Sequence, residues 1–323
     1  MGHDKLRKFA ENETFSCLLQ PDASAVLDKS GDPSDGLRLH DHAVKGRWNE
    51  LMFRKEQPIV LELGCGKGEY TIDLSRRLPD CNYIGVDIKG ARLWKGAKTA
   101  TQENLPNVAF LRTRIEFIEA FFGAGEVSEI WLTFSDPQLK SENSRLTSPL
   151  FLERYRRFLK PGGIIHLKTD SRFLHEYTMA VVRENGLSVL ASTTDLYAGT
   201  AGVTGEGSVE ADVLGGRVLP ATVATLGHVS GGTAGEAGGG VCEADVVRQD
   251  PATKDDLLKN KALYEVQTFY ERMFLSQGYK ITYMAFTIDH DGPYKHPSAF
   301  DSDYWRSIEG PRRFTHSPES SHR

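Results

Sequence analysis

The sequence feature that most constrains the fold is an apolar run that ends in three closely spaced glycines. Residues 59–63, Ile-Val-Leu-Glu-Leu, have the composition of a strand buried in a parallel sheet. Glycines follow at alternate positions, Gly64, Gly66 and Gly68. The apolar spacing of residues 69–78 then predicts an amphipathic helix. A strand that turns through glycines into a helix allows a ligand to approach backbone N–H groups, although such turns also occur without a ligand.

An acid follows the second predicted strand at a position that suits a sugar ligand. Residues 83–86 predict this strand, and Asp87 comes 21 positions after Gly66. A carboxylate there can accept hydrogen bonds from the two hydroxyls of a ribose. Asp87 could equally cap the helix predicted immediately after it, and both interpretations can hold together. Glu69 occupies the position of the last glycine in a dinucleotide fingerprint, which disfavours a nicotinamide dehydrogenase.

Predicted strands and helices alternate along most of the chain, which predicts an α/β fold. Further strands are expected at 108–111, 129–134, 164–167, 187–193 and 280–288. Further helices are expected at 91–101, 115–122, 149–159, 172–185 and around Leu263–Phe274. Such alternation predicts a Rossmann-like fold, an open and mostly parallel sheet with helices on both faces.

One segment interrupts this alternation and divides the chain. Residues 198–252 hold thirteen of the 31 glycines and no aromatic residue, so we expect a largely flexible insertion. The α/β domain is therefore expected at 46–197 and 253–288, after an N-terminal arm and loop at 1–45. Residues 289–323 are expected to form a polar, frayed C-terminal tail.

Composition and cysteine spacing indicate the compartment. The chain has no apolar run near 18 residues and its first nine residues are polar, so neither a membrane helix nor a secretory signal is expected. Its four cysteines, Cys17, Cys65, Cys81 and Cys242, show no C-x-x-C spacing. This argues against a zinc site and fits a reducing compartment, so the cytoplasm is expected and no metal is predicted.

The net charge of −5 argues against a nucleic-acid partner only at first sight. Residues 198–252 contain seven acidic residues and two arginines and therefore account for the whole net charge, which leaves the remaining chain neutral. A small basic cluster, Lys5, Arg7 and Lys8, lies near the N-terminus.

Charged residues also follow two later strands. Asp136 follows the strand at 129–134, Lys140 lies in the loop after it, and Asp170 follows the strand at 164–167. Because ligands of open α/β sheets bind beyond the carboxyl ends of the strands, these residues should share one crevice with the glycine turn. Each residue alone could equally be a loop charge or a helix cap.

Five motifs in order resemble the tRNA (guanine-N7)-methyltransferases of the bacterial TrmB type, which are class I S-adenosylmethionine-dependent enzymes. The resemblance covers residues 1–20 and 46–288 without the insertion. The motifs are 61–68 (Leu-Glu-Leu-Gly-Cys-Gly-Lys-Gly), 134–137 (Phe-Ser-Asp-Pro), 145–147 (Arg-Leu-Thr), 166–170 (His-Leu-Lys-Thr-Asp) and 268–271 (Thr-Phe-Tyr-Glu).

The resemblance implies methyl transfer from S-adenosylmethionine to N7 of a guanosine in tRNA, at position 46 of the variable loop. It implies that Asp136 is the active-site acid. It implies cofactor contacts from Glu62, Gly64, Cys65, Gly66, Asp87, Ile115 and Asp136, and contacts to the tRNA guanosine from Lys140, Asp170, Thr268, Tyr270 and Glu271. Lys140, Arg145 and the Lys5–Lys8 cluster would bind phosphates.

The chain departs from the family pattern in four places, of which two are the loop at 21–45 and the insertion at 198–252. Other functions also stay open. Gln138-Leu139 stands where many members have Trp-Pro, and Arg114 stands where an acid often contacts the adenine end. A methyltransferase for a small molecule would share the cofactor residues but would have no use for the basic residues. An RNA-binding protein with decayed catalysis is the alternative from another class. The sequence leaves open whether the protein is a monomer or a homodimer.

Overall fold

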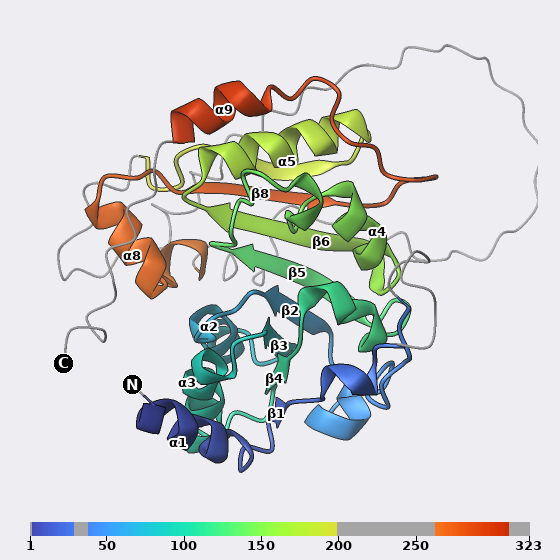
Figure 1. Ribbon diagram of the computed structural model, residues 1–323, viewed down its shortest axis with the longest axis vertical. Helices are drawn as coiled ribbons and strands as arrows, with labels where there is room; N and C mark the ends of the chain where they lie inside the picture. Colours follow the sequence, from blue (N-terminus) through green and yellow to red (C-terminus); the bar gives the residue numbers. More distant parts are fainter. Residues whose placement is uncertain (1, 29–37, 199–261, 310–323) are drawn as a thin grey trace, which may run out of the picture.

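A computed structural model describes residues 2–28, 38–198 and 262–309, which form one mixed sheet with helices on both faces (Figure 1). The strands are β1 (Leu18–Leu19), β2 (Ile59–Leu63), β3 (Asn82–Asp87), β4 (Val108–Arg112), β5 (Val127–Thr133), β6 (Leu159–Thr169), β7 (Val189–Thr193) and β8 (Thr282–Thr287). Their order is β1-β4-β3-β2-β5-β6-β8-β7. In the described sheet β8 alone runs opposite to all the other strands, so the predicted α/β fold with a mostly parallel sheet is confirmed.

The helices cover the sheet in two groups because residues along each strand alternate between its faces. The α-helices are α1 (Gly2–Asn12), α2 (Glu69–Arg77), α3 (Gly90–Gln102), α4 (Pro149–Arg156), α5 (Arg172–Glu184), α8 (Phe269–Ser276) and α9 (Ser302–Glu309). Buried residues of α4 and α5 belong to one apolar cluster with Leu61 and Ile130. Buried residues of α2 and α8 belong to another with Val60 and Trp131, and α3 packs beside them against Phe110.

The strand order reverses direction between β2 and β5. From β2 the chain proceeds outward through β3 and β4, whereas from β5 it proceeds to β6 on the other side. The helices that follow β2 and β5 therefore leave the sheet on opposite faces. Ligands of open α/β sheets bind at such a reversal, outside the carboxyl ends of the strands. The glycine turn follows β2 and Asp136 follows β5, so this edge of the sheet is the place where the site is expected.

Three predicted elements differ from the structure. The helix expected at 115–122 is a short 3-10 helix, η4 (Ile115–Ala120). The helix expected around Leu263–Phe274 is interrupted before α8, because the extended backbone of Thr268 caps a new helix. The tail expected to fray contains α9, which Figure 1 shows lying along α5. The two-residue strand β1 was missed because so short a segment has no measurable periodicity.

The N-terminal loop is better anchored than expected in its described parts. Val26 and Val44 are buried in the main apolar cluster, and Leu27 bridges to Leu39. The prediction for the glycine-rich insertion concerns residues outside the described ranges, apart from residue 198. No helix within the described ranges combines the length and apolar character needed to cross a membrane.

Candidate active site

The turn after β2 presents open backbone at the carboxyl edge of the sheet. Gly64 and Gly66 have φ angles of 78° and 59°, which disfavour residues with a side chain. The N–H groups of Gly64 and Cys65 both donate to the carbonyl of Val86, which ties the turn to the end of β3. A Cβ atom placed on Gly64 or Gly66 would meet nothing within 4 Å. A ligand could therefore lie directly against this backbone.

Asp87 supports the glycine turn from the end of β3. Its Oδ2 accepts the N–H of Gly66 at 3.0 Å and its Oδ1 accepts the N–H of Lys89 at 2.7 Å. The N-cap of α3 is Lys89, so the interpretation of Asp87 as the cap residue itself is wrong. A carboxylate offers about four acceptor positions, so two remain for hydroxyl donors such as those of a ribose.

Glu62 lies behind the turn and connects three elements. Its Oε2 accepts the N–H of Thr71 at 2.9 Å and its hydroxyl at 2.5 Å, and its Oε1 accepts the hydroxyl of Thr133 at 2.6 Å. The side chain is buried, and burial raises the pKa of the Glu62 carboxyl to about 7. Three protein donors thus occupy most of its acceptor capacity, so Glu62 shapes the turn more than it offers a free contact.

The Asp136 loop turns sharply after β5. Phe134 and Gln138 have φ angles of 51° and 46°, a region that side-chain-bearing residues seldom adopt and that costs about 1 kcal/mol or more. The N–H of Phe134 donates to the carbonyl of Lys168 at 2.8 Å, and the N–H of Gln138 donates to Asp136 Oδ1 at 2.9 Å. Asp136 itself is exposed. Two strained residues therefore flank an accessible carboxylate.

A buried arginine supports the Asp136 loop through hydrogen bonds to its carbonyl groups. Arg145 lies between the rings of Phe173 and Tyr177, at 4.7 and 4.3 Å, and its Nε–H donates to the carbonyls of Pro137 and Gln138, each at 3.3 Å. Its residue is only 3% exposed, so the prediction that Arg145 contacts phosphate is wrong for this structure. Burial lowers the pKa of the Arg145 guanidinium.

A second arginine reaches the same loop from the C-terminal helix. Arg306 of α9 donates to the carbonyl of Leu139 at 3.1 Å. The Oε2 of Glu309 accepts the N–H of Phe173, in the first turn of α5, at 3.0 Å. Lys140, at the end of the loop, is exposed. The loop that holds Asp136 thus receives donors from both α9 and the Arg145 side chain.

Asp170 lies at the same edge of the sheet, immediately after β6. It is 8% exposed and borders a pocket of about 340 Å³ together with Arg172, Tyr279 and Lys280. The backbone beside it is fixed, because Thr282 of β8 donates its hydroxyl to the carbonyl of Thr169 at 3.0 Å.

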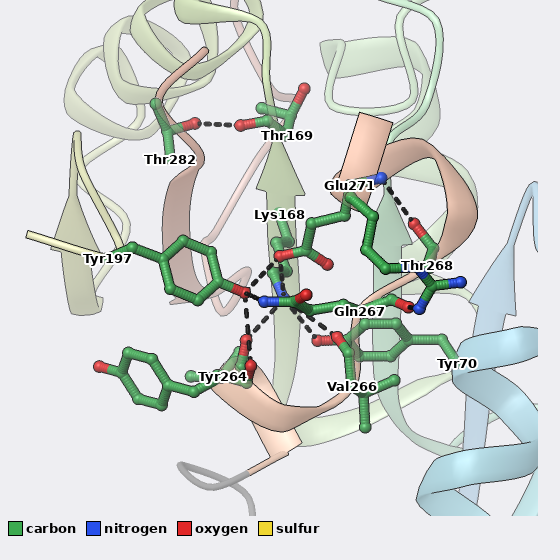
Figure 2. A network of polar contacts seen from close by, with 12 residues as sticks. Tyr70, Lys168, Thr169, Tyr197, Tyr264, Val266, Gln267, Thr268, Glu271 and Thr282 are labelled. Carbon is green, nitrogen blue, oxygen red and sulfur yellow. Dashed lines mark hydrogen bonds and ion pairs between the residues drawn. The ribbon is translucent and has the colours of Figure 1, made fainter. Parts of the chain in front are cut away.

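The motif at 268–271 forms the start of α8. Thr268 caps the helix, since its Oγ1 accepts the N–H of Glu271 at 3.1 Å. Glu271 is fully buried, and its Oε1 lies 2.8 Å from Lys168 Nζ and accepts the hydroxyl of Tyr197 at 2.6 Å (Figure 2). Tyr270 is 37% exposed. Of the three predicted contacts in this motif, only Tyr270 has an accessible side chain in this structure.

Two contacts that the sequence did not suggest tie α8 to the glycine turn. Glu69, at the start of α2, accepts the N–H of Phe269 at 2.9 Å, and Lys67 Nζ lies 5.3 Å from the centre of the Phe269 ring. The structure therefore brings the glycine turn, Asp87 and α8 close together.

The predicted cofactor contact Ile115 begins η4 and is half-buried against the main apolar cluster. Its neighbour Arg114 pairs with Glu116 at 3.2 Å.

The predicted basic cluster of α1 is partly neutralised. Arg7 pairs with Asp4 and Glu11, and Lys8 pairs with Asp4. Helix α3, against which α1 packs, contributes three further cations and no acid. The two helices together carry six Lys or Arg and two acidic residues, so this surface remains positive.

The strand order, the glycine turn and the acid at the end of β3 together define a class I methyltransferase fold. A family model described as "Putative methyltransferase" matches residues 56–207. The tRNA (guanine-N(7)-)-methyltransferase of Bacteroides thetaiotaomicron is 53% identical over 197 residues, covering 61% of this chain and 74% of that protein. The enzyme of the same name from Porphyromonas gingivalis is 39% identical over 304 residues, covering 93% and 97%. The chain belongs to the tRNA (guanine-N(7)-)-methyltransferase family.

Proposed function

We propose that this protein transfers a methyl group from S-adenosylmethionine to N7 of a guanosine in tRNA, at variable-loop position 46. The observation that carries the proposal is the meeting of the glycine turn, Asp87 and the exposed Asp136 at the point where the strand order reverses. The names of the relatives state methyl transfer to N7 of guanine in tRNA, which supports this part of the proposal. We place it in the cytoplasm, in keeping with the free thiols of Cys17, Cys65 and Cys81.

The described residues fit the cofactor that the family implies. The space beside Gly64 and Gly66 admits a ligand against the backbone, and Asp87 has acceptor positions left for two ribose hydroxyls. Glu62 holds the turn in this shape through Thr71 and Thr133. When bound, S-adenosylmethionine supplies an electrophilic methyl group.

The chain's own contribution to the reaction is alignment and charge. The N7 nitrogen of guanine has a free lone pair, so no residue needs to remove a proton before attack. Holding the base in line with its reaction partner lowers the barrier by removing translational and rotational freedom in advance. Asp136, exposed between two strained residues, can stabilise the positive charge that the guanine ring acquires.

The residues around Asp136 suit a nucleic-acid substrate. Asp170 can accept the N1–H and N2–H donors of guanine, and exposed Lys140 can pair with a phosphate. The positive surface of α1 and α3 provides further sites for backbone phosphates. A small-molecule methyltransferase would have no use for these cations.

The decisive experiment incubates unmodified bulk tRNA with labelled S-adenosylmethionine and identifies the methylated nucleoside and its position. We expect 7-methylguanosine in the variable loop, and loss of the label after RNase treatment of the substrate. Methylation that survives RNase treatment would favour a small-molecule substrate instead. Tight tRNA binding without methyl transfer would favour an RNA-binding protein with decayed catalysis.

A further inference from the structure

The strongest feature that the proposed chemistry does not use is a fully buried ammonium group. Lys168 lies near the carboxyl end of β6, two residues before Asp170, and is 0% exposed. Its Nζ lies 2.8 Å from Glu271 Oε1 and donates to the carbonyl of Leu263 at 2.6 Å and to the hydroxyl of Tyr70 at 3.3 Å (Figure 2). An ammonium has three donors, so these contacts satisfy it.

Segments far apart in the sequence meet at this ion pair. Tyr197, the last residue but one before the undescribed segment 199–261, donates its hydroxyl to Glu271 Oε1 at 2.6 Å. Leu263 comes just after that segment and offers its carbonyl to Lys168. Figure 2 shows Tyr197, Glu271 and Lys168 pointing toward one another from separate elements. The pair thus fixes both flanks of the segment to β6.

The backbone of Lys168 also supports the Asp136 loop. Its carbonyl accepts the N–H of Phe134, the strained residue two positions before Asp136, at 2.8 Å. The Phe134 ring stacks with Phe274 of α8, with centroids 6.2 Å apart. A shift of α8 would therefore move both Tyr270 and the loop that holds Asp136.

The position of Glu271 argues against direct contact with a base. Its Oε2 has no hydrogen-bond partner among the residues that the structure describes, so a guanine N–H could in principle use it. However, this atom is closed to solvent, and a base could reach it only if α8 moved away from Lys168. Such a movement would leave the buried ammonium without its carboxylate, which is unfavourable.

We propose that Lys168 is a positioning residue for the reaction: its ammonium holds α8 through Glu271, so that Tyr270 and the Asp136 loop keep their places at the site. Glu271 acts through Lys168 and does not bind the guanine. This inference rests on the proposed function, since it assigns a role within that reaction.

The test is a double-variant cycle measured with tRNA and S-adenosylmethionine. Lys168→Met keeps an unbranched side chain of nearly the same length but leaves Glu271 buried without its cation, so we expect kcat/KM for tRNA to fall by about 100-fold, the effect typical of misplaced substrate groups. Glu271→Gln in the same chain removes the unpaired charge, so Lys168→Met/Glu271→Gln should recover several-fold over Lys168→Met. S-adenosylmethionine affinity, measured by calorimetry, should stay within about 3-fold throughout. Lys160→Met, an exposed lysine at the other end of β6, is the matched control and should have no effect.

The opposite pattern would overturn the inference. If Glu271 contacted the guanine directly, the losses of the two single variants would multiply in the double variant.

Tyr197→Phe decides the matter if Lys168→Met fails to fold, because it keeps both charges and removes one donor to Glu271. It should lower kcat/KM for tRNA by about 5-fold, the value of one hydrogen bond, and unchanged kinetics would contradict the proposal. An inactive wild-type protein would refute the proposed function, whereas an active wild type with unaffected variants would refute only this inference.

Discussion

The two halves of the site differ in the charge of the side chains that hold each of them in place. On the side of β2 and β3, carboxylates accept backbone N–H groups: Glu62 binds that of Thr71, and Asp87 binds that of Gly66. On the side of β5 and β6, buried cations donate to backbone carbonyls: Arg145 binds that of Pro137, and Lys168 binds that of Leu263.

The difference follows from what each half presents. The glycine turn exposes N–H groups near a helix start, where carboxylates are the natural partners. The Asp136 loop offers carbonyl groups, those of Pro137 and Gln138 to the buried Arg145 and that of Leu139 to Arg306, so cations are the partners that hold it. Both sides combine local and distant contacts: Glu62 binds Thr71 and Thr133, 9 and 71 positions away, whereas Arg145 binds Pro137 8 positions away and Lys168 binds Leu263 95 positions away. We therefore expect changes on the β2 side to affect cofactor binding and changes on the β5 side to affect turnover.

The largest effect should come from Asp136, the exposed carboxylate on the side held by cations. Asp136→Asn keeps the size of the side chain and removes its charge, so turnover should fall about 100- to 1,000-fold, because the stabilising charge acts mainly in the transition state. Steady-state kinetics should show this fall while tRNA and cofactor affinities stay within a few-fold. Near-normal turnover would transfer the role to another acid, with Asp170 the first to test.

On the side of β2 and β3, the burial of Glu62 can be tested through the pH dependence of the protein's stability. Burial raises the pKa of its carboxyl to about 7 in the folded protein from an ordinary value of 4.5. The stability that this contributes is fully present below pH 4.5 and is lost as pH rises through 7. Between pH 5 and 8 the wild type should lose about 2 kcal/mol relative to Glu62→Gln in urea unfolding. Parallel pH profiles of the two proteins would contradict this assignment.

Removing the Arg145 guanidinium should affect the β5 side alone. Arg145→Met keeps an unbranched side chain between Phe173 and Tyr177 but loses the donors to the loop carbonyls. We expect the free energy of unfolding to fall by about 2 kcal/mol and turnover to fall about 10-fold, since hydrogen bonds from a charged donor are lost. Calorimetric affinity for S-adenosylmethionine should not change; a large loss there would break the division between the halves.

Asp87 should show the reverse pattern. Asp87→Ala removes the acceptor for Gly66 and the expected ribose contacts, so S-adenosylmethionine should bind about 10-fold more weakly or worse. Calorimetry measures this directly, and circular dichroism should show an intact fold. Unchanged affinity would leave Asp87 as a support for the turn only.

The smallest effect should come from Lys140, which is exposed and makes one expected phosphate contact. Lys140→Ala should weaken tRNA binding a few-fold, lower the slope of affinity against salt by about one and leave cofactor affinity unchanged. Filter binding at several salt concentrations provides the measurement. An affinity for tRNA that does not depend on salt would argue against a nucleic-acid substrate altogether.

The carboxyl-edge residues could be predicted from sequence because they lie at the ends of strands. The glycine turn, Asp87, Asp136 and Asp170 all lie within three residues of the end of a predicted strand, and a parallel sheet necessarily brings such ends to one edge. The class of fold followed from the alternation of strands and helices for the same reason.

The supporting residues could not be predicted, because burial and long-range pairing leave no local pattern. Arg145 and Lys168 read as loop and strand-end charges, yet each is buried in the fold. One signal was present: Thr268-Phe269-Tyr270-Glu271 has the spacing of a capping box, which marks a helix start. Even so, the capping pattern could not show that the Glu271 carboxylate would turn to Lys168.

The meeting of Tyr197 and Leu263 at one buried ion pair has a practical consequence for protein engineering. Tyr197 is held by its contact to Glu271 of α8, and Leu263 by its contact to Lys168 of β6. A reporter domain spliced between these anchors would have its entry and exit points set by the enzyme's own core. The linkers that join the inserted domain could then be lengthened or shortened from one fusion to the next without changing the positions of Tyr197 and Leu263.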